Sequence, residues 1–227
     1  MTFLELVQRV AAECGVPVSS LTTTAGQTGE ALRLVQWVNT AWLEIQGKRE
    51  DWEWMRTTAS WTTTQAQATY TTAQCGITAG TFGAWKPNTF RCYTTASGLS
   101  DEQYMVSVDY DYWRDKYQFG TNQTNYQRPD EIAVMPSKGV ALGPYPTSGF
   151  TIRGDYYLAP SELSGDSDTP EIRSYFHMAI VYGAMKSYAA FESAPEVYSR
   201  ADTQYRKLMK ELSRDQAPAN IVAEPLA

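Results

Sequence analysis

The sequence has a single histidine and only three cysteines, and both shortages exclude classes of site. The residues concerned are His177, Cys14, Cys75 and Cys92, and no two cysteines have a Cys-x-x-Cys spacing. Three cysteines are too few for a disulfide framework, and their spacing does not match a zinc site. We therefore expect a reducing compartment and no zinc.

Long apolar runs and basic clusters are also missing. No apolar run approaches the roughly 18 residues that a membrane span needs, and the first ten residues lack the basic start and apolar block of a signal peptide. The chain has 19 Lys and Arg against 25 Asp and Glu, a formal net charge of −6, with no basic stripe. Proteins that grip nucleic acid neutralise phosphates with such stripes, so that class is disfavoured. We expect a soluble protein that is neither exported nor bound to a membrane.

Length and composition are typical of a folded globular chain. Of the 227 residues, 43% are hydrophobic and 29 are aromatic, which argues against a mainly disordered protein. At roughly 100 to 200 residues per domain, this length suits one domain or two small ones.

Both ends of the chain have helical periodicity. The spacing of apolar residues predicts a helix over residues 1–14, with Thr2 and Glu5 as a capping box. A second helix is predicted after Thr28, ending near Gly47. Five residues are expected on its buried face: Leu32, Val35, Val38, Trp42 and Ile45.

Towards the C-terminus, Thr169, Pro170 and Glu171 have the pattern of an N-cap and first turn, and predict a third helix. Its expected buried face holds Tyr175, Met178, Ala179, Tyr182, Met185, Tyr188 and Ala189. A fourth helix is predicted from Pro195 to Asp215. Its apolar residues are Val197, Ala201, Tyr205, Leu208 and Leu212.

The middle of the chain has a different composition. Residues 57–85 contain no charged residue, and 13 of the 25 threonines lie in residues 57–95. Threonine loses side-chain freedom in a helix and fits a pleated surface, so this region is predicted to form strands. The predicted strands are 57–63, 68–74, 81–93, 105–108, 131–135, 139–143 and 149–158. Tyr110, Trp113 and Tyr117 have helical spacing and predict a short helix over residues 109–118.

These elements predict an α+β fold, in which both chain ends form an antiparallel helix bundle and an antiparallel β-rich domain is inserted between them. We expect N-terminal bundle helices in residues 1–56, the insertion in 57–165, C-terminal bundle helices in 166–215, and a flexible tail in 216–227.

No residue pattern indicates catalysis or a cofactor. His177 has no GxSxG nucleophile to serve, and Asp166-Ser-Asp168 lacks the glycine and closing glutamate of a calcium loop. The remaining candidates are acidic residues that are expected to be solvated loop and edge charges. They are Asp101, Glu102, Asp109, Asp111, Asp115, Asp155, Glu162, Asp166 and Asp168. We expect no enzymatic activity, no metal and no cofactor.

The tryptophans are concentrated in one segment. Four of seven lie within eighteen residues: Trp37, Trp42, Trp52 and Trp54. Tryptophan offers a large rigid contact area and is favoured both in cores and at interface centres. Core and subunit interface are equally good alternatives for Trp37 and Trp42, whereas Trp52 and Trp54, between helix and sheet, favour the core.

A family resemblance rests on this segment. An N-terminal helix is followed by the motif V-N-x-A-W-x-E-I-Q from Val38 to Gln46, by Asp51-Trp52-x-Trp54 leading into a Thr-rich strand, and finally by two helices and a loose tail. In this order the elements resemble the head-to-tail adaptor (head-completion) proteins of tailed bacteriophages. The resemblance covers the bundle well and the insertion by position only.

The resemblance implies a structural virion protein in the neck, assembled in the host cytoplasm. It implies a twelve-fold ring beneath the portal protein, a downstream tail or nozzle protein as second partner, and genomic DNA passing through without sequence-specific binding. Portal contact would fall on the fourth helix and the tail over residues 217–227, with Ile221, Val222 and Leu226 as anchors. A tail that cannot bury itself alone suits docking onto a partner. Negative charge suits a channel through which DNA slides.

Two other functions stay open at this point. The strand-rich middle could bind carbohydrate, as a receptor-recognition module, through a platform of Trp61, Tyr70, Trp85 and Tyr93. A carboxylate pair within residues 101–115 could support a glycosidase.

Overall fold

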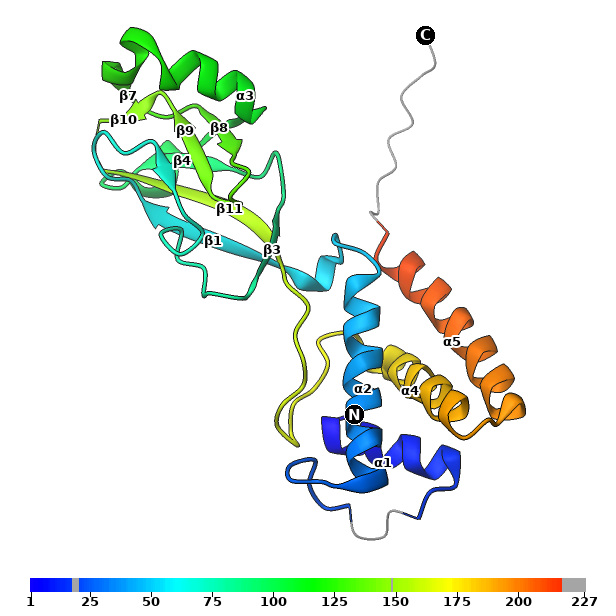
Figure 1. Ribbon diagram of the computed structural model, residues 1–227. Helices are drawn as coiled ribbons and strands as arrows, with labels where there is room; N and C mark the ends of the chain where they lie inside the picture. Colours follow the sequence, from blue (N-terminus) through cyan, green and yellow to red (C-terminus); the bar gives the residue numbers. More distant parts are fainter. Residues whose placement is uncertain (18–20, 148, 218–227) are drawn as a thin grey trace, which may run out of the picture. The chain divides into compact units, whose positions relative to one another are not determined.

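A computed structural model describes residues 1–17, 21–147 and 149–217, and the chain divides into two compact units. The helical unit comprises Met1–Trp54 and the chain from Pro160 onward, and the inserted unit is Met55–Ala159. The chain thus enters and leaves the inserted unit once (Figure 1). Each unit has its own core of buried residues.

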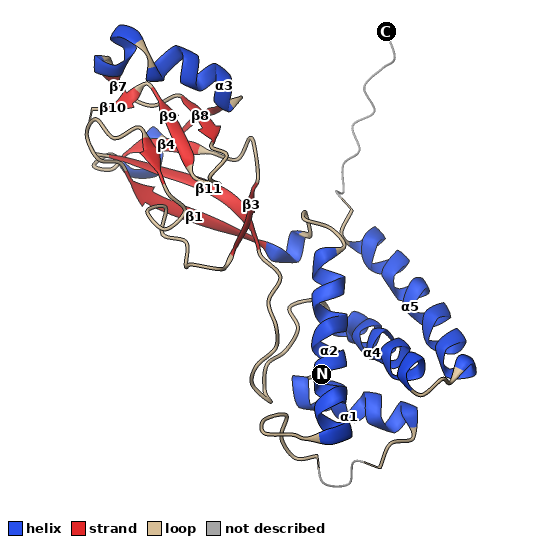
Figure 2. Ribbon diagram, viewed as in Figure 1, coloured by secondary structure: helices blue, strands red, loops and turns tan. Residues whose placement is uncertain are grey.

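The predicted α+β fold is confirmed: N-terminal helices pack with C-terminal helices, and the chain segment that separates them in sequence forms the sheets (Figure 2). The helical unit contains α1 (Phe3–Cys14), α2 (Gly29–Gly47), α4 (His177–Phe191) and α5 (Pro195–Asp215). Helix α4 contacts each of the other three. Among the described residues, no helix combines the length and apolar content needed to cross a bilayer.

Helix α1 begins and ends as the sequence predicts. Thr2 Oγ1 accepts from the Glu5 backbone N–H, and the Glu5 carboxylate accepts from the Thr2 N–H, so the capping box is confirmed. Gly15 ends the helix in the left-handed conformation at φ 71°, which glycine adopts at little cost. Two further N–H groups of the first turn, those of Phe3 and Leu4, donate to the carbonyls of Asp168 and Asp166.

The predicted start of the third helix at Thr169 is wrong. The helix α4 begins at His177, after a 3₁₀ turn η5 (Ser174–Phe176). Between Thr169 and His177 the Ile172 carbonyl lies 3.1 Å from His177 Nε2, while the carbonyls of Asp166 and Asp168, just before Thr169, cap α1.

The predicted buried faces are partly wrong as well. Tyr175 is 64% exposed, and α4 instead buries several small residues, including Gly183 and Ala184. A Cβ atom on Gly183 would lie 2.9 Å from Ala41 Cβ of α2, so small residues allow these two helices to approach closely. In α2, Val38, Trp42 and Ile45 are buried as predicted, while Leu32 in the first turn is exposed.

The inserted unit contains two main sheets. In the first, β11 (Phe150–Leu158) lies between β1 (Arg56–Thr62) and two strands that share its other edge, β4 (Arg91–Thr94) and β3 (Phe82–Trp85). The strand β5 (Gln103–Tyr104) extends this sheet beyond β4. The second sheet has the order β2 (Thr69–Tyr70), β9 (Val140–Gly143), β8 (Glu131–Val134) and β6 (Val106–Val108).

Several details of the insertion differ from the prediction. The segment 81–93 forms two strands, since the turn at Pro87 and Asn88 interrupts it, and 68–74 contributes only Thr69 and Tyr70. The pairs β6 with β8, and β7 (Tyr126–Gln127) with β10 (Tyr145–Pro146), are parallel, whereas the other pairs are antiparallel as predicted.

The insertion's core lies on the inner faces of the strands. Its members come from both main sheets and include Trp61, Phe90, Ile132, Leu142 and Ile152. The predicted short helix is confirmed as α3 (Tyr110–Trp113) with a π-helical turn η3 (Arg114–Gln118). Its Trp113 and Tyr117 pack on Ala133 and Ala141 of the second sheet. The remaining short elements are η1 (Glu53–Met55), η2 (Gly98–Asp101) and η4 (Gly120–Thr124).

Candidate interaction surfaces

His177 is a packing residue of the helical unit. Its side chain is only 2% exposed; Nδ1 lies 2.7 Å from the Met1 amino nitrogen and Nε2 lies 3.1 Å from the Ile172 carbonyl. Burial lowers the pKa of His177, which favours the neutral ring. Both ring nitrogens contact backbone groups, the Met1 amino group and the Ile172 carbonyl, so His177 helps to fix the start of α4 and has no hydroxyl or thiol to activate at these positions.

Several acidic residues predicted to be solvated are instead structural. Asp101 accepts from the Thr94 N–H and from Arg128; these hydrogen bonds, chiefly that of Thr94, lower the pKa of Asp101 to about 2. Asp155 accepts from Arg56 Nε at 2.8 Å and from Thr58 Oγ1 at 2.7 Å. These contacts give each carboxylate a role in fixing local structure.

The Asp166-Ser-Asp168 segment is likewise held by internal contacts. Asp166 Oδ1 accepts from the backbone N–H and the hydroxyl of Thr24, and Asp168 accepts from the backbone N–H groups of Ser164 and Gly165. Within the described residues, no group of three or more His, Cys, Asp or Glu side chains is placed to hold a metal ion. The carboxylates therefore shape a loop.

The cysteines are free thiols in packed surroundings. Burial raises the pKa of Cys75 to about 12, and it also raises the pKa of Cys14 and Cys92 to about 11. A thiol with so high a pKa is almost fully protonated at neutral pH, and the thiolate is the nucleophilic form. None of the three is suited to nucleophilic chemistry.

Trp52 closes the C-terminal end of α2. Its side chain is fully buried, and its Nε1–H donates to the carbonyls of Ile45 and Gln46 at 3.0 and 3.1 Å. These carbonyls belong to the last turn of α2, where i+4 donors run out; the Ile45 carbonyl also accepts the Lys48 N–H at 3.4 Å. Trp54 stacks on Trp42 with ring centroids 5.3 Å apart and contacts Trp52 at 6.1 Å. Trp42 and Trp52 thus lie inside the helical unit.

Two amides of the V-N-x-A-W-x-E-I-Q motif hold the chain where it returns from the insertion. Asn39 donates from Nδ2 to the Leu163 carbonyl and accepts the Leu163 N–H at Oδ1, both at 3.0 Å. Gln46 makes the same pair of bonds to Ser161, at 2.9 and 3.0 Å. The motif thereby supplies two bidentate clamps, with Ala41 facing α4 and Trp42 in the core. The sequence contained these residues, but their distant backbone partners could not be identified from it.

Trp37 has a different environment from Trp42 and Trp52. It is half-buried, and its ring contacts Tyr188 and Phe191 of α4 at centroid distances of 6.0 and 5.8 Å. The Arg33 guanidinium lies 4.4 Å from the Phe191 ring, which is 53% exposed. We call Arg33, Trp37, Tyr188 and Phe191 the aromatic patch. It is an exposed aromatic surface of the kind found at interface centres.

The predicted carbohydrate platform is wrong. Trp61, Tyr70 and Trp85 are 6%, 3% and 6% exposed and belong to the core of the inserted unit. The Trp85 indole N–H donates a hydrogen bond to the Lys138 carbonyl at 2.8 Å. A sugar ring needs an accessible aromatic face, so these three residues cannot provide the stacking surface.

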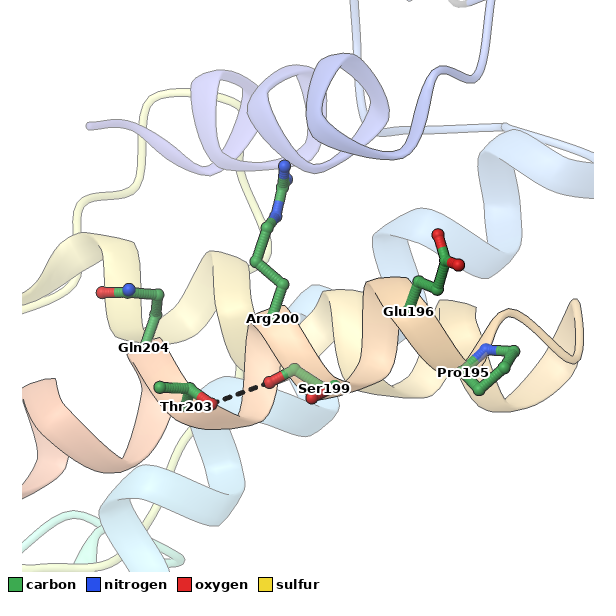
Figure 3. A pocket seen from close by; sticks show the side chains of 6 residues that line it. All are labelled: Pro195, Glu196, Ser199, Arg200, Thr203 and Gln204. Carbon is green, nitrogen blue, oxygen red and sulfur yellow. Dashed lines mark hydrogen bonds between the residues drawn. The ribbon is translucent and has the colours of Figure 1, made fainter.

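The shallow depression on α5 contains no catalytic arrangement. Figure 3 shows its side chains along the exposed face of the helix, with Arg200 directed towards α1, where it binds Glu13 at 2.8 Å. The hydroxyl of Thr203 donates to the Ser199 carbonyl. Pro195, Glu196 and Gln204 complete the lining. The depression is a helix surface with an ion pair to α1.

The outer face of the first sheet is polar and charged. Arg91 of β4 and Arg153 of β11 are direct cross-strand partners, and Arg56 lies on the same face of β1. Asp155 and Glu102 lie among them in a shallow groove, whose remaining lining is Thr58, Asn88, Thr89 and Gly154. We call this surface the basic groove.

The predicted portal anchors Ile221, Val222 and Leu226 lie outside the described residues. A search of the curated proteins found no match to the chain. The family model described as SU10 adaptor protein matches residues 1–223, nearly the whole chain. The chain therefore belongs to the SU10 adaptor protein family, and it is a phage head-to-tail adaptor whose role is structural and not enzymatic.

Proposed function

We propose that the protein forms a twelve-fold ring between portal and tail and continues the DNA channel into the tail. The observation that carries this proposal is the family match over residues 1–223, because it implies association with head and tail components of the virion. The net charge of −6 supports a channel role, since walls of like charge avoid the phosphate contacts that would retain DNA.

The aromatic patch supports the ring as a subunit contact. Phe191 and Trp37 offer large, rigid side chains at the surface of the helical unit, and such residues dominate the energetics of interfaces. In a closed ring each copy uses two different surfaces, so the patch would meet another part of its neighbour. Trp42, Trp52 and Trp54 serve the core of each copy under this proposal.

The portal contact is proposed for residues 216–227, with Ile221, Val222 and Leu226 as apolar anchors. Many symmetric copies of a weak docking segment bind a symmetric partner far more tightly than one copy does. The other side of the ring would receive the downstream tail or nozzle protein.

The test is electron microscopy of the purified protein mixed with the portal protein of its virion. We expect rings with twelve subunits seated on the portal. A variant lacking residues 218–227 should remain folded and fail to attach. Attachment by this variant would contradict the role of the tail, and particles without rings would contradict the ring itself.

The patch is tested in the same assay with Phe191→Ser. We expect fewer rings, because the variant loses an exposed aromatic contact. Tyr198→Ser is the matched control, since Tyr198 is 43% exposed on α5 and lies outside the patch. Equal ring yields for both variants would contradict a contact at the patch.

A further inference from the structure

The basic groove places like charges directly opposite each other. Arg91 and Arg153 face one another across β4 and β11, and like charges in this position destabilise a sheet. Glu102 Oε1 lies 3.4 Å from Arg153 Nη1. The Arg91 guanidinium carbon lies 4.7 Å from the centroid of the Tyr104 ring, and its Nη1 donates to the Phe90 carbonyl at 3.0 Å. The sheet therefore tolerates an unfavourable pair at an accessible surface.

The groove and its rim keep a positive excess. Asp155 is bound by Arg56, and Glu102 is near Arg153, so the two carboxylates are matched by two guanidinium groups. Arg91 adds a further positive charge to the groove. An anionic partner would relieve the repulsion between Arg91 and Arg153.

Charge is distributed unequally between the two units. Residues 55–159 contain eight Lys and Arg against eight Asp and Glu, whereas residues 1–54 and 160–227 contain 11 against 17. The whole net charge of −6 therefore belongs to the helical unit. A surface with excess positive charge on the neutral unit is complementary to the helical unit of another copy.

The most concentrated acidic segment of the helical unit is the return segment, residues 161–171. It has four acidic residues and no basic one. The clamps of Asn39 and Gln46 fix the backbone on both sides of Glu162, whose side chain is exposed while that of Leu163 is buried. Glu171 at the other end is also exposed. A fixed backbone presents these carboxylates at little entropic cost on binding.

We propose that the basic groove of one copy binds the acidic return segment of a neighbouring copy. This inference rests on the proposed ring and assigns two complementary surfaces to its subunit contact. The contact is heterologous, as a ring requires, because the groove and the segment are different parts of the chain. Opposite charges aligned in this way fix the register of neighbouring subunits and disfavour wrong pairings.

Double-stranded DNA is the less suitable occupant. A protein that binds DNA through its backbone neutralises several phosphates with Lys and Arg, whereas this groove has three arginines against two carboxylates. Its two carboxylates lie between the arginines and would repel phosphates. A carboxylate-bearing protein segment matches the small excess better.

The test is charge reversal in the full chain, read out as ring assembly on the portal by electron microscopy and sedimentation. The variant Arg91→Glu with Arg153→Glu and the variant Glu162→Arg with Glu171→Arg should each lower the fraction of ring subunits at least about tenfold. The variant with all four substitutions should recover most of the assembly, because the attraction is restored with inverted signs. Circular dichroism of each variant checks folding.

Three results would overturn the inference. The first is ring assembly by either double variant at the level of the unsubstituted protein, which would leave the proposed ring standing. The second is failure of the fourfold variant to recover while it remains folded. The third is binding of duplex DNA by the unsubstituted protein at physiological salt, if the variant with Arg91→Glu and Arg153→Glu loses this binding and still forms rings. Absence of rings from the unsubstituted protein would instead contradict the proposed function itself.

Discussion

The two units hold distant parts of the chain together in different ways. In the inserted unit, β1 and β11, nearly a hundred residues apart, pair through backbone hydrogen bonds over seven residue pairs. In the helical unit, α2 and the return segment are joined by the side chains of Asn39 and Gln46. Backbone pairing tolerates many sequences, whereas a side-chain clamp requires particular residues. This difference explains why a recognisable motif occurs in the helical unit and none in the insertion.

The substitution Trp52→Ala has the largest expected effect and tests whether the two units have separate cores. The substitution removes a fully buried indole and uncovers the last carbonyls of α2, and we expect the free energy of unfolding to fall by about 3–5 kcal/mol. Hydrogen exchange followed by mass spectrometry should show faster exchange in α2 and α4 and unchanged exchange in β1 and β11. Equal acceleration in both units would contradict separate cores.

Trp52→Phe separates the two contributions of this residue. It keeps most of the apolar volume and loses the indole donor, so we expect a smaller loss of stability, about 1–3 kcal/mol. If the two variants were equally destabilised, the hydrogen bonds to Ile45 and Gln46 would account for most of the effect.

The clamps predict the next largest effect. Asn39→Ala leaves the N–H and carbonyl of Leu163 without these partners, which we expect to lower stability by about 1–3 kcal/mol. The return segment should also become more sensitive to a protease that cleaves at Glu162. Gln36→Ala is the control, because Gln36 is an exposed residue of the same helix. Unchanged proteolysis in Asn39→Ala would show that the clamp does not hold the segment.

The contact between α2 and α4 gives a comparable test within one unit. Gly183→Ala would place a Cβ 2.9 Å from that of Ala41, and we expect about 1–3 kcal/mol of destabilisation by overpacking. Gly47→Ala is the matched control, because it lies in α2 with no atom near the new Cβ and should be neutral or stabilising. A stable Gly183→Ala variant would mean that the helices can move apart without loss.

The helices could be predicted because their signals are local. The capping box of Thr2 and Glu5 and the apolar spacing of α5 depend on residues within a few turns, and both are observed. The start of α4 lies at His177, whose ring is held between the Ile172 carbonyl and the Met1 amino group, 176 residues away in sequence. A local pattern at Thr169 cannot report such a distant contact.

The sequence predicted that the insertion forms strands, but it did not predict which of its residues lie on the outer face of the sheet. Its threonine content indicated a sheet, yet the register that buries Trp61 and Trp85, and that sets Arg91 opposite Arg153, depends on which strands pair. A shift of one residue would exchange inner and outer faces. The basic groove could therefore not be predicted from the sequence without the strand order.

The smallest expected effect concerns pH and again separates the units. Burial holds the pKa of His177 below its usual value, so between about pH 6.5 and the lower folded value the unfolded chain binds more protons than the folded one. The contribution of His177 to stability is complete above that range and is lost as the pH falls through it, although Glu5 nearby opposes the shift. Denaturant unfolding of the helical unit, followed from about pH 7 to 5, should show this loss, and His177→Gln should remove it.

Carboxyls with lowered pKa values, such as Asp101, titrate at lower pH and therefore do not contribute to the change in stability over this pH range. The inserted unit has no histidine, so a similar slope in its strands would show that the two units do not respond to pH independently.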